Sequence, residues 1–179
     1  MESLTEPKKT LFVAVEIPLF VIDALISWVQ KHLVHTKGEV DFVPPHLWAI
    51  PFISIGTDKS KAFEASSFAL GKVSKLMKPL DFDVFVPRQK DSMLVAPVCA
   101  RHPDSFVETT TIAMRLLEDM GFEVQQIEPS ICMGSSSKAL ESPLEPLISF
   151  VGSHLWLACT VHEALPSFKM LRHFSLPGA

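Results

Sequence analysis

The order of the apolar segments constrains the fold more than any other feature of the sequence. Residues 10–17 are a short apolar run rich in β-forming side chains that ends at Pro18, which predicts a buried strand. Over residues 19–33 apolar side chains recur at three- and four-residue spacing, which predicts an amphipathic helix. Residues 40–55 return as extended chain, and a turn and helix cap at residues 56–58 predict a second helix.

The second half of the chain repeats this order. Residues 92–100 are a predicted strand, Asp104 is the predicted cap of a helix that runs to Met120, and residues 122–133 return as extended chain. Residues 147–160 and 168–176 predict a closing strand pair. A duplicated strand–helix–strand unit predicts an α+β fold with two lobes around a central cleft.

Composition limits the class of protein. The chain has 179 residues, of which 47% are hydrophobic and 20% charged, so we expect a single domain over residues 1–179 with a polar tail at residues 1–9. The formal net charge of -4 argues against binding to an extended nucleic-acid backbone. No apolar run reaches the ~20 residues of a membrane helix, so no membrane contact is expected. Three widely spaced cysteines and the lack of a visible secretory signal predict a cytoplasmic protein, which we expect to be a monomer.

Two segments occupy equivalent positions in the two halves. Aligning the two returning strands places Pro45-His46-Leu47-Trp48 against Pro129-Ser130-Ile131-Cys132. Residues at positions i and i+2 of a strand point to the same side. We therefore expect His46 and Trp48 on one wall of the cleft, and Ser130 and Cys132 on the other.

Taken together, the segments resemble the bacterial RNA 2',3'-cyclic phosphodiesterase family, also called the 2'-5' RNA ligase family, of the two-histidine phosphoesterase superfamily. The resemblance rests on residues 10–18, 43–48, 120–122, 128–133 and 168–176, and covers nearly the whole chain in order. It implies a two-lobed fold with one His-x-Thr/Ser motif on each lobe. It also implies opening of a 2',3'-cyclic phosphate by two imidazoles, one accepting and one donating a proton, without a metal or other cofactor.

The motif positions depart from the family pattern. The resemblance assigns the first motif to residues 46–48, where His46 is retained as the catalytic residue and Trp48 replaces the hydroxyl side chain. Ser130 and Cys132 stand where the family has histidine and threonine, and serine transfers no proton near neutral pH. Loss of one proton-transfer group costs about 10²–10⁴-fold in rate. We therefore predict a catalytically impaired protein that binds a nucleotide or an RNA end, with His46 on phosphate and Trp48 stacked on a base.

Two alternatives stay open at this point. The first is an active cyclic phosphodiesterase whose second acid or base is His102, His154 or His173, or in which Cys132 acts as a nucleophile with His46 as its base. The second is a protein-interaction scaffold whose cleft is filled by side chains, and this alternative predicts a buried Trp48.

Metal sites are not expected. The pairs His32-x-x-His35 and Cys159-x-x-His162 have spacings that suit a metal, but neither pair brings the third and fourth ligands that a zinc site needs. Residues 134–138, Gly-Ser-Ser-Ser-Lys, lack the first glycine of a phosphate-binding loop, so we expect a surface loop there.

Overall fold

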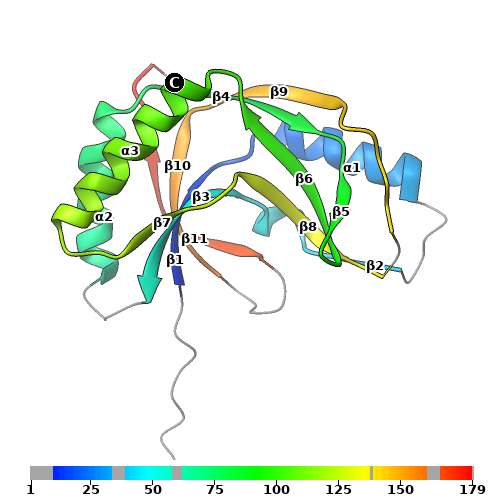
Figure 1. Ribbon diagram of the computed structural model, residues 1–179, viewed down its shortest axis with the longest axis horizontal. Helices are drawn as coiled ribbons and strands as arrows, with labels where there is room; N and C mark the ends of the chain where they lie inside the picture. The colour runs from blue at the N-terminus through cyan, green and yellow to red at the C-terminus, as the bar shows by residue number, and fades with distance from the viewer. Residues whose placement is uncertain (1–9, 34–38, 58–61, 138, 161–165, 179) are drawn as a thin grey trace, which may run out of the picture.

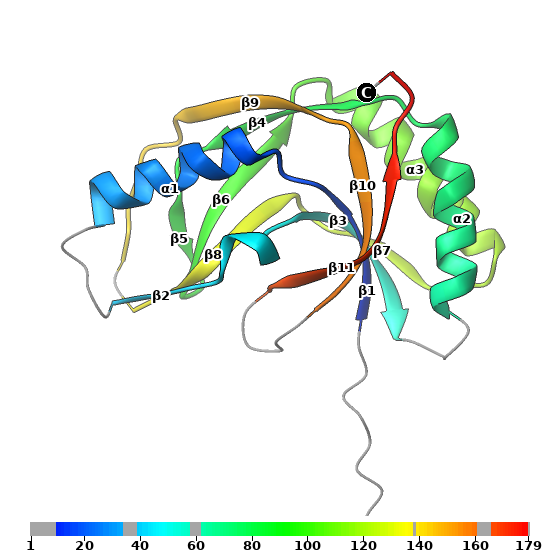
Figure 2. The same ribbon diagram turned by 180° about the vertical axis from the view of Figure 1, so that it is seen from behind.

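The computed structural model describes residues 10–33, 39–57, 62–137, 139–160 and 166–178. Within these ranges the chain forms two antiparallel sheets and three α-helices (Figures 1 and 2). The helices are α1 (Leu19–Leu33), α2 (Ala62–Leu76) and α3 (Pro103–Asp119), together with a short 3-10 helix, η1 (Pro45–Leu47). The strands are β1 (Thr10–Val15), β2 (Val40–Phe42), β3 (Ile50–Thr57), β4 (Leu80–Phe85), β5 (Arg88–Lys90), β6 (Met93–Ala100), β7 (Val124–Gln126), β8 (Ser130–Ser136), β9 (Pro146–Gly152), β10 (His154–Thr160) and β11 (Phe168–Ser175).

Each lobe is built around one sheet. The first sheet has the strand order β11-β10-β1-β3-β7, and α2 and α3 cover it on the side that faces away from the second lobe (Figures 1 and 2). The second sheet has the order β2-β8-β6-β4-β9, with β5 paired to β6, and α1 packs against β9. The α+β fold with two lobes is therefore confirmed.

Strand alternation divides the side chains of the first sheet between two faces. Leu11, Val13 and Val15 of β1 are buried in the main hydrophobic core. The opposite face of the same strand carries Thr10 and Phe12, and it looks toward the second lobe. Because one face of β1 packs in the core, Thr10 and Phe12 on its other face are the side chains that lie between the lobes.

The helix boundaries follow the sequence pattern with one correction. Helix α1 spans the predicted residues, and the carbonyl of Pro18 accepts its first hydrogen bonds. The preceding strand β1 ends at Val15, two residues before the predicted end. The cap predicted at Asp104 is wrong. The N-cap of α3 is His102, Pro103 occupies the first turn where its missing N–H costs nothing, and Asp104 lies inside that turn. The helix cap predicted at residue 58 lies outside the described residues.

The strand predictions miss several boundaries. Residues 147–160 form two strands instead of one, because the chain passes from the second sheet to the first between Gly152 and His154. The sequence pattern did not indicate β4 and β5, although β4 alternates buried and half-buried side chains. The predicted pairing of the last two strands is confirmed, since β10 and β11 are antiparallel neighbours. No helix in the described part of the chain is long and apolar enough to cross a membrane.

Gly134 allows β2 to approach β8, and this contact gives a test of the fold. A Cβ atom at Gly134 would overlap the carbonyl oxygen of Asp41, which is backbone and has little freedom to move. We expect Gly134→Ala to lower the free energy of unfolding by about 1–3 kcal/mol, the usual cost of overpacking. Urea-induced unfolding measures this change.

Gly71 in α2 supplies the matched control. A Cβ atom there meets only a ring carbon of Phe174 at 3.7 Å, which is ordinary contact. We expect Gly71→Ala to raise the stability by about 0.5–1 kcal/mol, because alanine favours a helix interior over glycine. Equal effects of the two substitutions would contradict the packing of β2 on β8.

Candidate functional site

A cavity of about 440 Å³ lies between the two sheets, where β3 and β8 come close to each other. We call it the cleft cavity. The first sheet contributes side chains from β1, β3, β10 and β11, and the second sheet contributes side chains from β6 and β8. Its polar groups are the hydroxyls of Thr10, Ser130 and Thr160 and the thiol of Cys132. Its apolar wall consists of Phe12, Pro51, Met93, Val95, Ile127, Pro166 and Phe168.

Side chains alternate between the two faces of β3 and of β8, and this alternation determines which of them enter the cleft cavity. Ile50 and Ile131 both have 0% exposure and belong to the main core. Their strand neighbours point the other way, so Pro51 enters the cavity from β3 while Ser130 and Cys132 enter it from β8. Pro51 therefore lines the same cavity as Ser130 and Cys132, from the other sheet.

The expectation that His46 faces Ser130 across one cleft is wrong. His46 is exposed and belongs to η1. The strand on which it was expected, β3, begins only at Ile50. The turn forms because Pro44 and Pro45 restrict the backbone. The N–H groups of Leu47 and Trp48 then donate to the carbonyls of Pro44 and Pro45 at 2.9 and 3.1 Å. No described lining residue is shared between the cavity beside His46 and the cleft cavity.

Trp48 also lies outside the cleft cavity. Its side chain is 3% exposed, and its indole N–H donates to the carbonyl of Val43 at 2.9 Å. The hydrogen bond and the burial fix this ring as part of the core. Stacking of a nucleobase on Trp48, which the sequence motif suggested, is therefore not supported by its position.

The floor of the cleft is apolar between its two ends. Ala14, Ala49, Ala158 and Phe168 form a small buried cluster, against which the partly buried Phe12 packs. The rings of Phe12 and Phe168 meet edge to face with centroids 5.3 Å apart. Among the described residues, no acidic, basic or imidazole side chain lines the cleft cavity. Such a site suits a flat apolar group better than an anion.

Cys132 is the one titratable group of the cleft cavity among the described residues. The residue is 7% exposed, and burial raises the pKa of the thiol. The thiolate is the nucleophilic form of cysteine, so a raised pKa lowers the reactive fraction at neutral pH. His46, the base considered for this thiol, lines a different cavity.

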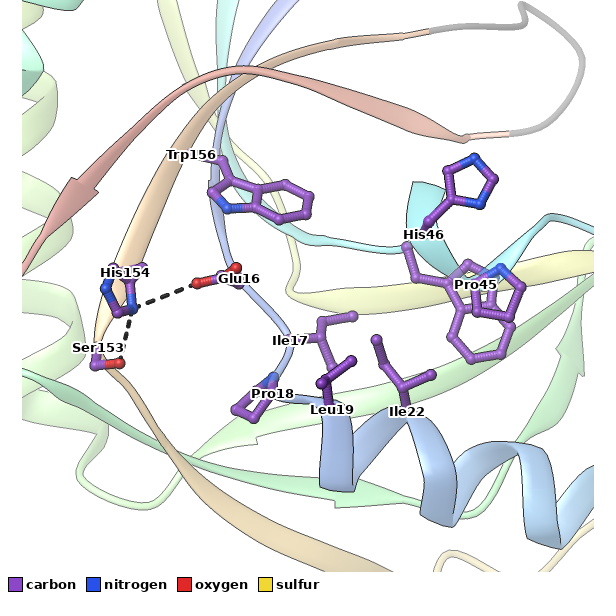
Figure 3. A pocket seen from close by; sticks show the side chains of 11 residues that line it. Glu16, Ile17, Pro18, Leu19, Ile22, Pro45, His46, Ser153, His154 and Trp156 are labelled. Carbon is purple, nitrogen blue, oxygen red and sulfur yellow. Dashed lines mark hydrogen bonds and ion pairs between the residues drawn. The ribbon is translucent and has the colours of Figure 1, made fainter.

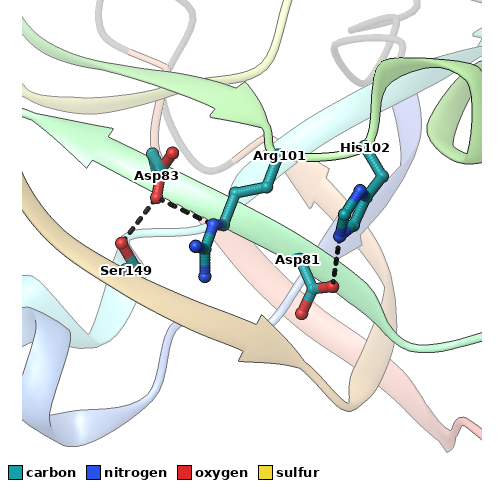
Figure 4. Close-up of polar contacts among 5 residues, drawn as sticks. All are labelled: Asp81, Asp83, Arg101, His102 and Ser149. Carbon is teal, nitrogen blue, oxygen red and sulfur yellow. Dashed lines mark hydrogen bonds and ion pairs between the residues drawn. The ribbon is translucent and has the colours of Figure 1, made fainter.

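The other histidines considered as acids or bases also lie elsewhere. Figure 4 shows His102 beside Asp81, with 3.5 Å between Nε2 and a carboxylate oxygen, next to a second ion pair of Arg101 and Asp83 at 3.5 Å. The side chain of His102 is 73% exposed, so this contact is a surface ion pair. Its nearest cavity is a small one beside the start of α3.

His154 and His173 lie on the neighbouring strands β10 and β11. Their ring centroids are 6.3 Å apart, and His173 is exposed. His154 lines the cavity that contains His46, and Figure 3 shows the two rings on opposite sides of it. Neither His154 nor His173 lines the cleft cavity.

The two spacings considered for metals do not produce a centre in the described part of the chain. No group of three or more His, Cys, Asp or Glu residues there is arranged to hold a metal ion. The Nδ1 atom of His32 lies 2.9 Å from the carbonyl of Trp28, and the two rings are stacked. His35 and His162 lie outside the described residues. The surface loop expected at residues 134–138 is wrong for residues 134–136, which belong to β8, and Lys138 lies outside the described residues.

Comparison with known proteins identifies the fold. No protein-family model matches the sequence, and no curated protein matches it. E. coli LigT in its apo form aligns with a TM-score of 0.71 and 17% identity, over 96% of this chain and 99% of LigT. TT0787 of Thermus thermophilus aligns with a TM-score of 0.66 and 18% identity, over 93% of this chain and 97% of TT0787. A phosphoesterase crystal structure aligns with a TM-score of 0.72 and 15% identity, over 95% of this chain and 99% of the phosphoesterase chain.

These similarities confirm the fold that the sequence resemblance implied. LigT has also been solved with 3'-AMP, with NADP+, with ATP and with phosphate. At such low identity the similarity applies to the arrangement of helices and strands. What this chain does must therefore be argued from its own residues.

The raised pKa of the Cys132 thiol predicts slow alkylation. We expect iodoacetamide at neutral pH to modify the exposed Cys99 first and Cys132 about tenfold or more slowly. The rate at Cys132 should increase only as the pH rises past the ordinary range of a thiol pKa. Peptide mass spectrometry over a pH series measures both rates, and Cys99→Ser leaves only the buried Cys132 and Cys159, which lie in different peptides. Rapid labelling of Cys132 at neutral pH would contradict an inert thiol.

Proposed function

We propose that this chain is a member of the two-histidine phosphoesterase superfamily, in the branch of the RNA 2',3'-cyclic phosphodiesterases, that binds a nucleotide or an RNA end without hydrolysing it. The observation that carries the proposal is the composition of the cleft cavity. Pro51 lines it from one sheet, and Ser130 and Cys132 line it from the other. None of these three side chains is an effective acid or base near neutral pH.

In this proposal both walls of the cleft cavity lack a side chain that transfers protons. Opening a cyclic phosphate requires one group that accepts a proton from water and another that protonates the leaving ribose oxygen. Either loss alone lowers the rate by about 10²–10⁴-fold. The charge on the phosphate oxygens also needs cations or several strong donors, whereas the described lining of the cleft cavity offers no cation and only neutral hydroxyls and a thiol as side-chain donors.

Retention of binding is supported by the shape and the walls of the cavity. A volume of about 440 Å³ lies within the range of ligand pockets. Phe12 and Phe168 provide aromatic surface for a base, and Met93 and Val95 face them from the other sheet. The hydroxyls of Thr10, Ser130 and Thr160 supply both donors and acceptors for a base edge or a ribose.

The proposal places the base, and not the phosphate, in the cleft cavity. A phosphate is ordinarily held by Lys, Arg, a metal ion or several backbone N–H groups. The described lining residues include neither Lys nor Arg. We therefore expect recognition of the nucleoside part of a ligand, with its phosphate outside the cavity.

The two alternatives find less support. His102, His154 and His173 line other surfaces, so an active enzyme would need a substitute acid and a substitute base from elsewhere. The scaffold alternative predicts a buried Trp48, and Trp48 is buried, but it packs in the core beside η1 and leaves the cleft cavity open. A cytoplasmic location and a monomeric state belong to the same proposal, and the free state of Cys99, Cys132 and Cys159 is consistent with a reducing compartment.

Binding of the base predicts similar affinities for a nucleoside and a nucleotide. Isothermal titration calorimetry should give dissociation constants for adenosine and 3'-AMP within about threefold of each other, with little dependence on salt. An affinity for 3'-AMP more than about tenfold higher would show that a phosphate site contributes. Absence of binding by both would shift the support to the scaffold alternative.

Two variants locate the binding site. Ser130→Trp should abolish binding of adenosine, because the indole fills the cleft cavity from β8. His46→Ala should change the dissociation constant less than about twofold, since His46 lines the other cavity. Thermal unfolding of both variants checks that they are folded. A loss of binding in His46→Ala together with normal binding in Ser130→Trp would place the ligand outside the cleft cavity.

A further inference from the structure

A second cavity of about 380 Å³ lies beyond one end of the cleft floor, and its residues are not used by the proposed function. It is enclosed by β10, by the segment that joins β1 to α1, and by η1 (Figure 3). It shares no described lining residue with the cleft cavity, so an inference about it is independent of the proposed function. We call it the α1 cavity.

One wall of the α1 cavity carries a carboxylate. A side-chain oxygen of Glu16 lies 3.3 Å from Nδ1 of His154, and Oγ of Ser153 lies 2.9 Å from the same nitrogen (Figure 3). The Glu16 side chain is 42% exposed, so the carboxylate remains accessible to a ligand. Among the residues that the structure describes, no Lys or Arg lines this cavity. Glu16 is therefore the one carboxylate of the described lining, and no Lys or Arg there offsets its charge.

A second wall is the indole of Trp156. This residue is half-buried and lines the cavity, while its indole nitrogen is buried and has no hydrogen-bond partner in the described structure. The accessible part of the ring is therefore carbon. An indole surface attracts cations through its quadrupole more strongly than the other aromatic side chains do.

The remaining wall is aliphatic. Ile17, Pro18, Leu19 and Ile22 line it at the start of α1, and Figure 3 shows them below Trp156 and opposite its ring. A carboxylate, an indole surface and an aliphatic wall are the three elements that hold an ammonium group and a short alkyl chain. We propose that the α1 cavity binds an organic cation, an amine or a quaternary ammonium compound with a small apolar body.

One feature of the α1 cavity would favour an anion instead. The positive end of the dipole of α1 lies at Leu19, and the first turn of α1 contains no acidic side chain. The carboxylate of Glu16 opposes this dipole, so the charge of the ligand that binds tests the proposal.

The probes are choline, its uncharged carbon analogue 3,3-dimethylbutan-1-ol, and inorganic phosphate. Each is titrated at about pH 8, where imidazole is ordinarily neutral, into protein labelled with ¹⁵N. The indole N–H resonance of Trp156, assigned with Trp156→Phe, reports occupancy. We expect choline to shift this resonance with saturation at millimolar concentration or below, and the uncharged analogue to bind at least about tenfold more weakly.

Matched variants test the role of the charge. Glu16→Gln keeps an acceptor for His154 but removes the charge, and it should weaken choline binding about tenfold while leaving the analogue unaffected. Asp23→Asn makes the same charge change at an exposed position of α1 outside the cavity and should have no effect. Trp156→Leu should weaken choline binding by a similar factor, with the resonances of β10 used as the reporter.

Three results would overturn the proposal. The first is no response to choline at about 10 mM, and the second is equal affinity for choline and its uncharged analogue. The third is tighter binding of phosphate, which would identify an anion site. Because adenosine and 3'-AMP are expected in the cleft cavity, a failure here leaves the nucleoside measurements unchanged.

Discussion

The burial of Ile50 and Ile131 is the constraint on which the rest of the site depends. Each isoleucine is fully enclosed by the core, one from each sheet, and each fixes the phase of its strand. A shift of one residue in either strand would turn its core-facing side chains toward the cleft cavity. Because these two residues point into the core, Pro51 on one strand and Ser130 and Cys132 on the other line the cleft cavity between the lobes.

The chemistry of the cleft follows from this arrangement. Small and apolar side chains on the floor allow Phe168 to pack on Ala14, Ala49 and Ala158, and a charged group introduced there would lose its hydration. Among the described residues neither wall carries an effective proton-transfer group, which is consistent with the proposal of binding without hydrolysis. The same face of the first sheet continues past Ala14 to Glu16, and at that end polar groups return in the α1 cavity.

Much of the fold was accessible from the sequence, because the alternation of residues 10–17 and the helical spacing of residues 19–33 are strong local signals. The placement of His46 on a cleft strand failed, because Pro44 and Pro45 impose a 3-10 turn and the strand begins only at Ile50. The α1 cavity was beyond sequence reasoning, since it joins Glu16, His46 and Trp156 from distant segments.

We propose that the cleft carries out no phosphodiester hydrolysis. The most direct measurement is ³¹P nuclear magnetic resonance of adenosine 2',3'-cyclic phosphate mixed with an equal amount of the purified protein, because an equal amount of protein reveals even a single turnover. We expect the cyclic phosphate signal to persist at the rate of the protein-free solution. Conversion to a 2'- or 3'-monophosphate faster than in that control, and in proportion to protein concentration, would contradict the account.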